Sequence, residues 1–229
     1  MQPTNYSTLM LHVISKNNTI ANHFIAEMRD TTIQADSMRF RKNMKRLGQI
    51  ISYEISKTLE YVPAEVITPL GTAITSVLSS QPVLATILRA GLPLHEGMLD
   101  FLDKAENAFI SSYRRHHKDG TFDIQVEYVS SPSIDNKVVI LADPMIATGQ
   151  SMYLAYKALL QKGNPKAIHI VGLIASAEGL EYLQRRLPST AQLWIGAIDE
   201  EMTVQSYIVP GLGDAGDLAY GSKSVAELV

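Results

Sequence analysis

The sequence predicts an α/β protein in which a parallel β-sheet is flanked by helices. From Pro82 onward, short apolar runs of strand length alternate with segments whose apolar residues recur at helical spacing. Several of the short runs are apolar throughout, which is typical of strands covered on both faces. Short buried strands that alternate with helices favour a parallel sheet.

The composition favours one globular domain. A chain of 229 residues that is 46% hydrophobic can bury a full core. The net charge of −3 gives no bulk attraction to nucleic acid or to acidic membranes, so a phosphate-rich ligand needs a local site. The sequence has no cysteine, which excludes disulfides and thiolate metal sites and is compatible with a reducing compartment. Without an evident targeting segment, we expect a soluble, cytoplasmic protein.

A long helix is expected in the N-terminal third. Asp36 or Ser37 is a suitable N-cap, and the helix should run to about Glu60, with Pro63 closing it. One apolar stripe supports it, made of Phe40, Met44, Leu47, Ile51, Ile55 and Leu59.

A second helix is expected at 65–79. The uncharged stretch 66–88 contains Pro69, Gly71 and several hydroxyl residues, so it is too broken for a membrane span. We interpret this stretch as a helix segment, a turn and the start of a strand.

The remaining elements follow in order. We expect strands at 83–88, 108–113, 123–129, 137–142, 167–175 and 192–198, and helices at 94–104, 150–162 and 178–186. The strand at 123–129 alternates like a more exposed one. We expect a single domain, with N-terminal helices in about 1–80, a core in about 81–200 and a C-terminal loop region in about 201–221.

The segment from Val138 to Ser151 is the most informative. An apolar strand ends at Asp143, and a turn of small residues leads into a helix. Ligands bind at the carboxyl ends of parallel strands, and the amides of 147–151 would lie at a helix N-terminus, which favours an anion. Asp143 could hold ribose hydroxyls or a hydrated magnesium ion. An ordinary strand-to-helix turn capped by Thr148 is the alternative.

A second segment, 207–217, is rich in glycine. Glycines let a ligand touch the backbone, and main-chain amides and carbonyls can recognise the edge of a neutral ring, with Ile208 against its face. A calcium loop is excluded, because Asp214 and Asp217 lack the required spacing and the distal Glu. A plain surface turn stays open as the alternative.

Together these segments resemble the uracil phosphoribosyltransferase family. Asp143–Ser151 is similar to the loop that binds phosphoribosyl pyrophosphate (PRPP) in type I phosphoribosyltransferases, in the version that has Pro144 as its second residue. The run Tyr-Ile-Val-Pro-Gly-Leu-Gly-Asp-Ala-Gly-Asp at 207–217 is nearly a signature of the family. The resemblance covers 82–221. It implies a type I phosphoribosyltransferase core with a hood from N- and C-terminal segments, and the joining of uracil to PRPP to give UMP and pyrophosphate in pyrimidine salvage.

The resemblance also implies roles for the matching residues. Uracil would contact Ile208, Gly213, Asp214 and Ala215, and Asp214 would also face PRPP. The implied catalytic residues are Asp143, Asp214 and Arg114. PRPP would contact Arg89, Arg114, Asp143, Pro144, Met145, Ile146, Ala147, Thr148, Gly149, Gln150, Ser151 and Asp214.

Cofactor and partners follow from the same resemblance. Mg²⁺ would arrive with PRPP, without direct side-chain ligation, and the chain would form a homodimer or a higher homo-oligomer. Neither nucleic acid nor membrane is an expected partner. The alternatives are a regulator that uses the fold to bind nucleotides or RNA, and a transferase for another base. Residues 115–118 are interpreted as a solvated loop, and His169 as a core or edge histidine.

Overall fold

The computed structural model describes residues 9–116 and 122–222, with side chains described for all of these except 112–116 and 122–125. Within these ranges, eight strands form the central sheet, in the order β1-β10-β9-β7-β4-β5-β6 with β8 beside β9. The strands are β1 Met10–Val13, β4 Val83–Leu88, β5 Glu106–His116, β6 Phe122–Ser130, β7 Val138–Ala142, β8 Met145–Ile146, β9 Ala167–Ser176 and β10 Gln192–Asp199. All pairs are parallel except β5 with β6, so the predicted fold class is confirmed.

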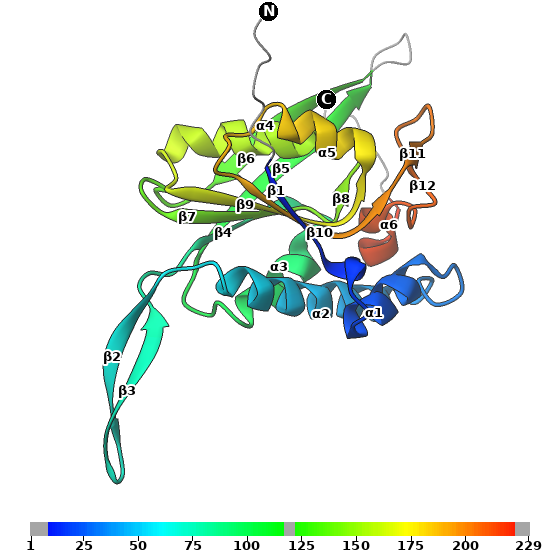
Figure 1. Ribbon diagram of the computed structural model, residues 1–229. Helices are drawn as coiled ribbons and strands as arrows, with labels where there is room; N and C mark the ends of the chain where they lie inside the picture. The colour runs from blue at the N-terminus through cyan, green and yellow to red at the C-terminus, as the bar shows by residue number, and fades with distance from the viewer. Residues whose placement is uncertain (1–8, 117–121, 223–229) are drawn as a thin grey trace, which may run out of the picture.

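Helices cover both faces of the sheet (Figure 1). One layer holds α1 Ile20–Arg29, α2 Ser37–Ser56, α3 Leu92–Leu99 and α6 Ala215–Tyr220, and the other holds α4 Gln150–Leu159 and α5 Ala177–Gln184. Short 3₁₀ helices occupy Ile14–Lys16 and Leu160–Lys162. Successive strand residues point to opposite faces, so Leu84 and Ile140 pack with the first layer while Val83 and Val139 pack with the second.

Helix α2 forms as predicted at its start and ends earlier than predicted. Asp36 is the N-cap, and its carboxylate accepts hydrogen bonds from the amides of Met38 and Arg39. The predicted stripe is fully buried from Phe40 to Ile55, and burial of such side chains contributes about 1.5–3 kcal/mol each. The helix ends at Ser56, and single turns follow before the next strand.

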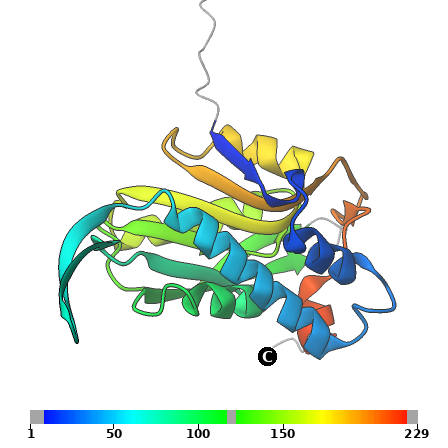
Figure 2. The same cartoon turned by 60° about the horizontal axis from the view of Figure 1, so that its bottom comes forward.

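The predicted helix at 65–79 is wrong, and so is the role of Pro63 as a helix stop. The chain instead forms a hairpin of β2 Tyr61–Thr68 and β3 Gly71–Leu78 that extends away from the body (Figures 1 and 2). Its turn is the pair Pro69-Leu70, closed where Thr68 pairs with Gly71. The strands are rich in β-branched residues, which favour extended backbone. Here apolar spacing alone did not separate a helix from a strand.

Other differences concern boundaries and short elements. β5 extends over 106–116, and α3 spans 92–99 in place of 94–104. The sequence analysis did not place β1, α1, β8, α6, β11 Glu201–Met202 or β12 Ile208–Val209. β1, β8, β11 and β12 have two to four residues each, too few for a periodic pattern to emerge. The division of the chain into three regions stays a prediction, although the first 80 residues also supply β1 and the hairpin.

Candidate active site

The site begins where the sheet changes its winding direction. β4 and β7 are neighbours, with Thr86 paired to Ala142. From β4 the chain proceeds through α3 to β5 on one side, and from β7 through α4 to β9 on the other. Such a switch point opens a crevice at the carboxyl ends of the strands, where ligands of α/β proteins bind. Arg89 follows β4 and Asp143 follows β7, so both predicted residues flank this point.

The first half of the phosphate loop (Asp143–Ser151) is attached to β9 by its backbone. The amide of Asp143 donates to the carbonyl of Val171 over 3.0 Å, and the carbonyl of Pro144 accepts from the amides of Leu173 and Ile174. The next two residues form β8, which pairs with β9. The loop is therefore continuous with the most buried part of the sheet.

The second half of the phosphate loop is held by the start of α5. Ser176 Oγ donates to the carbonyl of Ala147 over 2.6 Å and accepts from the amide of Gly179 over 2.8 Å. A Cβ on Gly179 would lie 2.2 Å from Ala147 O, so only glycine allows this approach. Gly149, at φ +75°, is the N-cap of α4 in place of Thr148, whose hydroxyl receives a long 3.4 Å contact from the Gln150 amide.

This arrangement leaves the loop suited to an anion. The first amides of a helix have no acceptor within the helix, and the helix dipole favours negative charge at that end. α4 begins at Gln150, directly after the loop's small residues. The half-buried Asp143 accepts a 3.4 Å contact from the amide of Met145. An acid beside an anion site is suited to hydroxyl groups of the same ligand.

The glycine-rich loop (Tyr207–Asp217) lies beyond the end of β10. Ile208 is buried on β12, and the peptide bond before Pro210 is cis. Gly213 is exposed with φ +94°, and Ala215 is buried at the start of α6. Asp214 is the N-cap of α6, and its Oδ1 accepts from the amide of Asp217 over 2.9 Å. Asp214 therefore has a structural role as the N-cap of α6, and its role toward uracil and PRPP stays a prediction.

Arg89 joins the sheet to the segment that follows the glycine-rich loop. Its Nη2 lies 3.4 Å from Asp217 Oδ1 and donates to the carbonyl of Gly221 over 3.2 Å. The side chain is exposed to solvent. The structure thus brings together one of the predicted pyrophosphate contacts and the end of the predicted base-binding segment.

Arg114 is only partly described. Its backbone lies in β5, opposite Ile124 of β6, and its side chain lies outside the described residues. The same holds for the side chains of Arg115 and His116, whereas 117 and 118 lie wholly outside them. The predictions for this run therefore stay predictions.

Comparison with known proteins decides the family. The sequence model described as uracil phosphoribosyltransferase matches residues 14–222, which is most of the chain. The chain belongs to the uracil phosphoribosyltransferase family.

Individual relatives agree with this assignment. A uracil phosphoribosyltransferase of Porphyromonas gingivalis is 54% identical over 206 residues, covering 90% of this chain and 95% of the relative. One from Methanococcus vannielii is 38% identical over 200 residues, covering 86% and 85%. The solved structure of the AQ2163 protein from Aquifex aeolicus superposes with a TM-score of 0.82 at 28% identity, covering 93% of this chain and 98% of that one.

The sequence analysis did not predict two residues that contact the glycine-rich loop in this member of the uracil phosphoribosyltransferase family. Arg29, at the end of α1, and Asp199, at the end of β10, form an ion pair with both nitrogen–oxygen distances at 2.8 Å. The pair also binds the backbone of Gly211. The partners lie 170 positions apart, so no local signal could have joined them.

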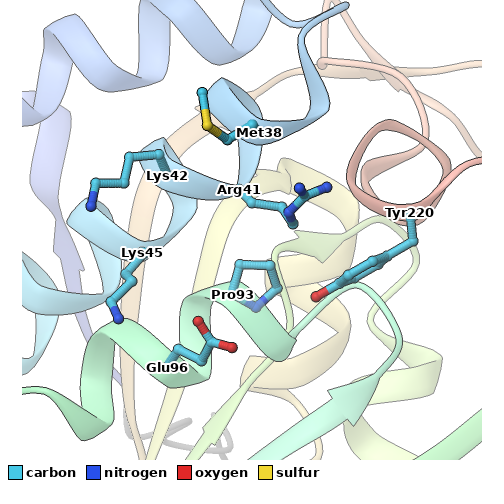
Figure 3. A pocket seen from close by; sticks show the side chains of 7 residues that line it. All are labelled: Met38, Arg41, Lys42, Lys45, Pro93, Glu96 and Tyr220. Atoms are coloured by element: carbon cyan, nitrogen blue, oxygen red, sulfur yellow. The ribbon is translucent and has the colours of Figure 1, made fainter.

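A cavity of about 300 Å³ opens beside α6 (Figure 3). Arg41 reaches across from α2, where its Nη1 donates to Ala219 O over 2.5 Å and its guanidinium lies 5.9 Å from the centre of the Tyr220 ring. Burial and the nearby Glu96 raise the pKa of Tyr220. The lining residues are Met38, Arg41, Lys42, Lys45, Pro93, Glu96 and Tyr220. None of them was predicted from the sequence to contact uracil or PRPP.

His169 is a core histidine, which confirms its interpretation. It lies buried in β9, and its Nδ1 accepts from Nε1 of Trp194 over 3.0 Å. His12 stacks on the other side of Trp194 at 3.7 Å. Burial, followed by the proximity of His12, lowers the pKa of His169 to about 4.

The described residues offer neither a metal-binding cluster nor a membrane-spanning helix. Within 9–116 and 122–222, no three His, Cys, Asp or Glu side chains gather in a way that could hold a metal ion. No helix in the same ranges has the length and apolar character needed to cross a membrane.

Proposed function

We propose that this chain transfers the phosphoribosyl group of PRPP to uracil, which yields UMP and pyrophosphate in pyrimidine salvage. The family match over 14–222 supports this function. The structural observation that carries it is the contact of Arg89 with the α6 segment, because it joins the switch point of the sheet to the glycine-rich loop. A site for two substrates needs both parts at one place.

In this proposal the phosphate loop binds the 5′-phosphate of PRPP. The amides of 147–151 offer donors at the start of α4, and Thr148 and Ser151 add hydroxyl groups. Asp143 accepts hydrogen bonds from the ribose hydroxyls. Arg89 and Arg114 hold the pyrophosphate, where negative charge develops as the bond to the sugar breaks.

The glycine-rich loop orients uracil. Ile208 lies against the ring face, while the backbone of 213–215 matches the carbonyl and N–H groups of the ring edge, and Asp214 acts at the border with PRPP. Uracil N1 then forms a bond to the anomeric carbon, pyrophosphate leaves with its bonding electrons, and the N1 proton is released. Much of the rate comes from holding the two reactants in this geometry.

The donor set fits a magnesium ion that arrives on PRPP. The pyrophosphate itself offers several hard oxygen ligands for such an ion. Asp143, directly after β7, is suited to hold a water of such an ion. When bound, the ion offsets the negative charge of the leaving pyrophosphate.

We also propose a homodimer or higher homo-oligomer whose contact includes the β2–β3 hairpin. Ile67 and Ile74 share one face of the hairpin and are 90% and 76% exposed, and Leu70 at the tip is fully exposed. The hairpin extends away from the rest of the chain, which therefore does not cover this face (Figures 1 and 2). A second copy offers the same apolar surface, and twofold symmetry lets the two cover each other.

Light scattering after gel filtration tests the oligomer. The wild type should elute as a dimer or larger, and the double variant Ile67→Asp with Ile74→Asp should shift toward the monomer mass. Ala73→Asp with Thr75→Asp, which adds the same charge to the opposite face of the hairpin without removing isoleucines, is the control. A monomeric wild type would contradict the proposal.

The function is tested by measuring UMP formed from uracil, PRPP and Mg²⁺, with adenine, hypoxanthine and orotate as parallel substrates. Of the four bases, we expect only uracil to give a product. Turnover with another base would keep the PRPP assignments and discard those for uracil. Retained PRPP binding without turnover would favour a regulator.

A further inference from the structure

One ion pair makes hydrogen bonds to both the backbone amide and the backbone carbonyl of a single residue in the glycine-rich loop. Asp199 Oδ2 accepts from the amide of Gly211 over 2.9 Å, and Arg29 Nη1 donates to the carbonyl of Gly211 over 2.8 Å. The same arginine and aspartate bind each other through two hydrogen bonds. The amide and the carbonyl of Gly211 are therefore both fixed by one pair of side chains.

The loop turns tightly at this point. Gly211 has φ +58°, and a Cβ there would lie 2.2 Å from the carbonyl oxygen of Ile208. The anchored residue lies three positions after Ile208 and two before Gly213, between the proposed ring contact and the proposed edge contacts. A shift of Gly211 would move both groups of uracil contacts together.

Both partners of the pair are attached to rigid parts of the molecule. Asp199 is the last residue of β10, is 7% exposed and pairs in register with Ser176 of β9. Arg29 ends α1, whose Ala21, Ile25 and Met28 are buried in the core together with Phe40 and Met44 of α2. The anchor therefore fixes the loop to the sheet on one side and to the helical layer on the other.

We propose that Arg29 and Asp199 are positioning residues for the base subsite. The inference rests on the proposed function, because it assigns the uracil contacts to the anchored loop. The bidentate geometry is specific to the planar guanidinium, so lysine at position 29 keeps the charge and loses the double contact. Uracil binding then weakens because the loop backbone no longer holds the arrangement that matches the ring edge.

The chain offers a matched control. Arg39 and Glu27 also form a bidentate pair that involves α1, and among the described residues no hydrogen bond or ion pair joins these two side chains to 208–215. Arg29→Lys and Arg39→Lys thus remove the same kind of interaction, one at the loop and one away from it. A merely structural role for Arg29 would make the two variants behave alike.

Steady-state kinetics and hydrogen exchange test the proposal. For Arg29→Lys we expect the KM for uracil to rise about tenfold, because the loosened loop binds the ring edge less tightly, with the KM for PRPP within about twofold of wild type. Peptides covering 208–213 should exchange faster. Arg39→Lys should leave both readouts unchanged. Asp199→Asn, which keeps an acceptor for the Gly211 amide, should have a smaller effect than Asp199→Ala.

Two outcomes overturn the inference. An unchanged KM for uracil in Arg29→Lys would do so, as would an equal rise in Arg39→Lys. If the wild-type chain makes no UMP, the proposed function is wrong. Hydrogen exchange of 208–213 then still tests whether Arg29 and Asp199 hold the loop. Faster exchange in Arg29→Lys but not in Arg39→Lys supports it, and equal exchange in the two variants contradicts it.

Discussion

The phosphate loop and the glycine-rich loop are held in place by different means. The phosphate loop is fixed mainly by backbone hydrogen bonds to β9 and by the approach of Gly179 and Ser176. The glycine-rich loop is held by side chains from distant segments, namely Arg29 and Asp199 at Gly211 and Arg89 at Asp217. The first arrangement is made mostly by the sheet itself, whereas the second also requires Arg29 from the helical layer.

This difference has a consequence for how each loop responds to change. A loop that is fixed by the backbone tolerates the loss of one side-chain contact, whereas it does not tolerate an added Cβ at a close approach. A loop that is fixed by a few side chains can be loosened by a single substitution far from the ligand. Substitutions that disturb the phosphate loop should therefore raise the KM for PRPP, and substitutions that loosen the glycine-rich loop should raise the KM for uracil.

The largest effect is expected for Asp143→Asn, which tests the chemical part of the phosphate loop. The amide keeps the size of the side chain and removes its charge, so kcat should fall about 100-fold while the thermal midpoint changes little. Kinetics and thermal unfolding measure the two quantities. Asp103→Asn, at an exposed aspartate, is the control. Wild-type kinetics in Asp143→Asn would refute the assignment.

Arg114→Ala tests whether the proposed pyrophosphate contacts include a residue of β5. A lost charge-assisted hydrogen bond corresponds to a rise of about tenfold to a hundredfold in the KM for PRPP. Arg115→Ala, in the run interpreted as solvated, should have little effect. If the KM for uracil changed instead, the proposed division between the two substrates would be wrong.

Gly179→Ala tests the backbone support of the phosphate loop. The new Cβ would lie 2.2 Å from Ala147 O, so the loop must shift, and the KM for PRPP should rise about tenfold. The KM for uracil should stay near wild type, which is the converse of the result expected for Arg29→Lys. Glu178→Ala, at the exposed neighbour in α5, serves as the control. Equal changes for both substrates would remove the contrast between the loops.

The smallest effect on activity is expected from His169, which lies in the core between β10 and β7. Its folded pKa of about 4 is below its unfolded value of 6.5, so the unfolded chain binds more protons between these values and stability falls as the pH falls. From pH 7.5 to 5 the loss should be about 2 kcal/mol for this group.

Denaturant unfolding at the two pH values measures this loss. His169→Asn can still accept from Trp194 and does not titrate, so its stability should depend less on pH. The same slope in His169→Asn as in wild type would show that another group is responsible.

The sequence by itself determined the parts of this protein that are encoded by contiguous residues. The strands from 83 to 198, the capped start of α2 and the turn after Asp143 follow from local periodicity, capping and small-residue patterns. The glycine-rich run was recognised in the same way. Within these segments the predictive signal is carried by neighbouring residues, as apolar periodicity, a capping residue or a run of small residues.

Only the tertiary structure decided how these parts meet. The hairpin at 61–78 was misread because its apolar residues fit a helix as well as a strand. β1 forms because β10 is present to pair with it, and the anchor at Gly211 joins residues from α1 and β10. Such contacts depend on distances in space between residues far apart in the chain, and one sequence carries no local signal for them.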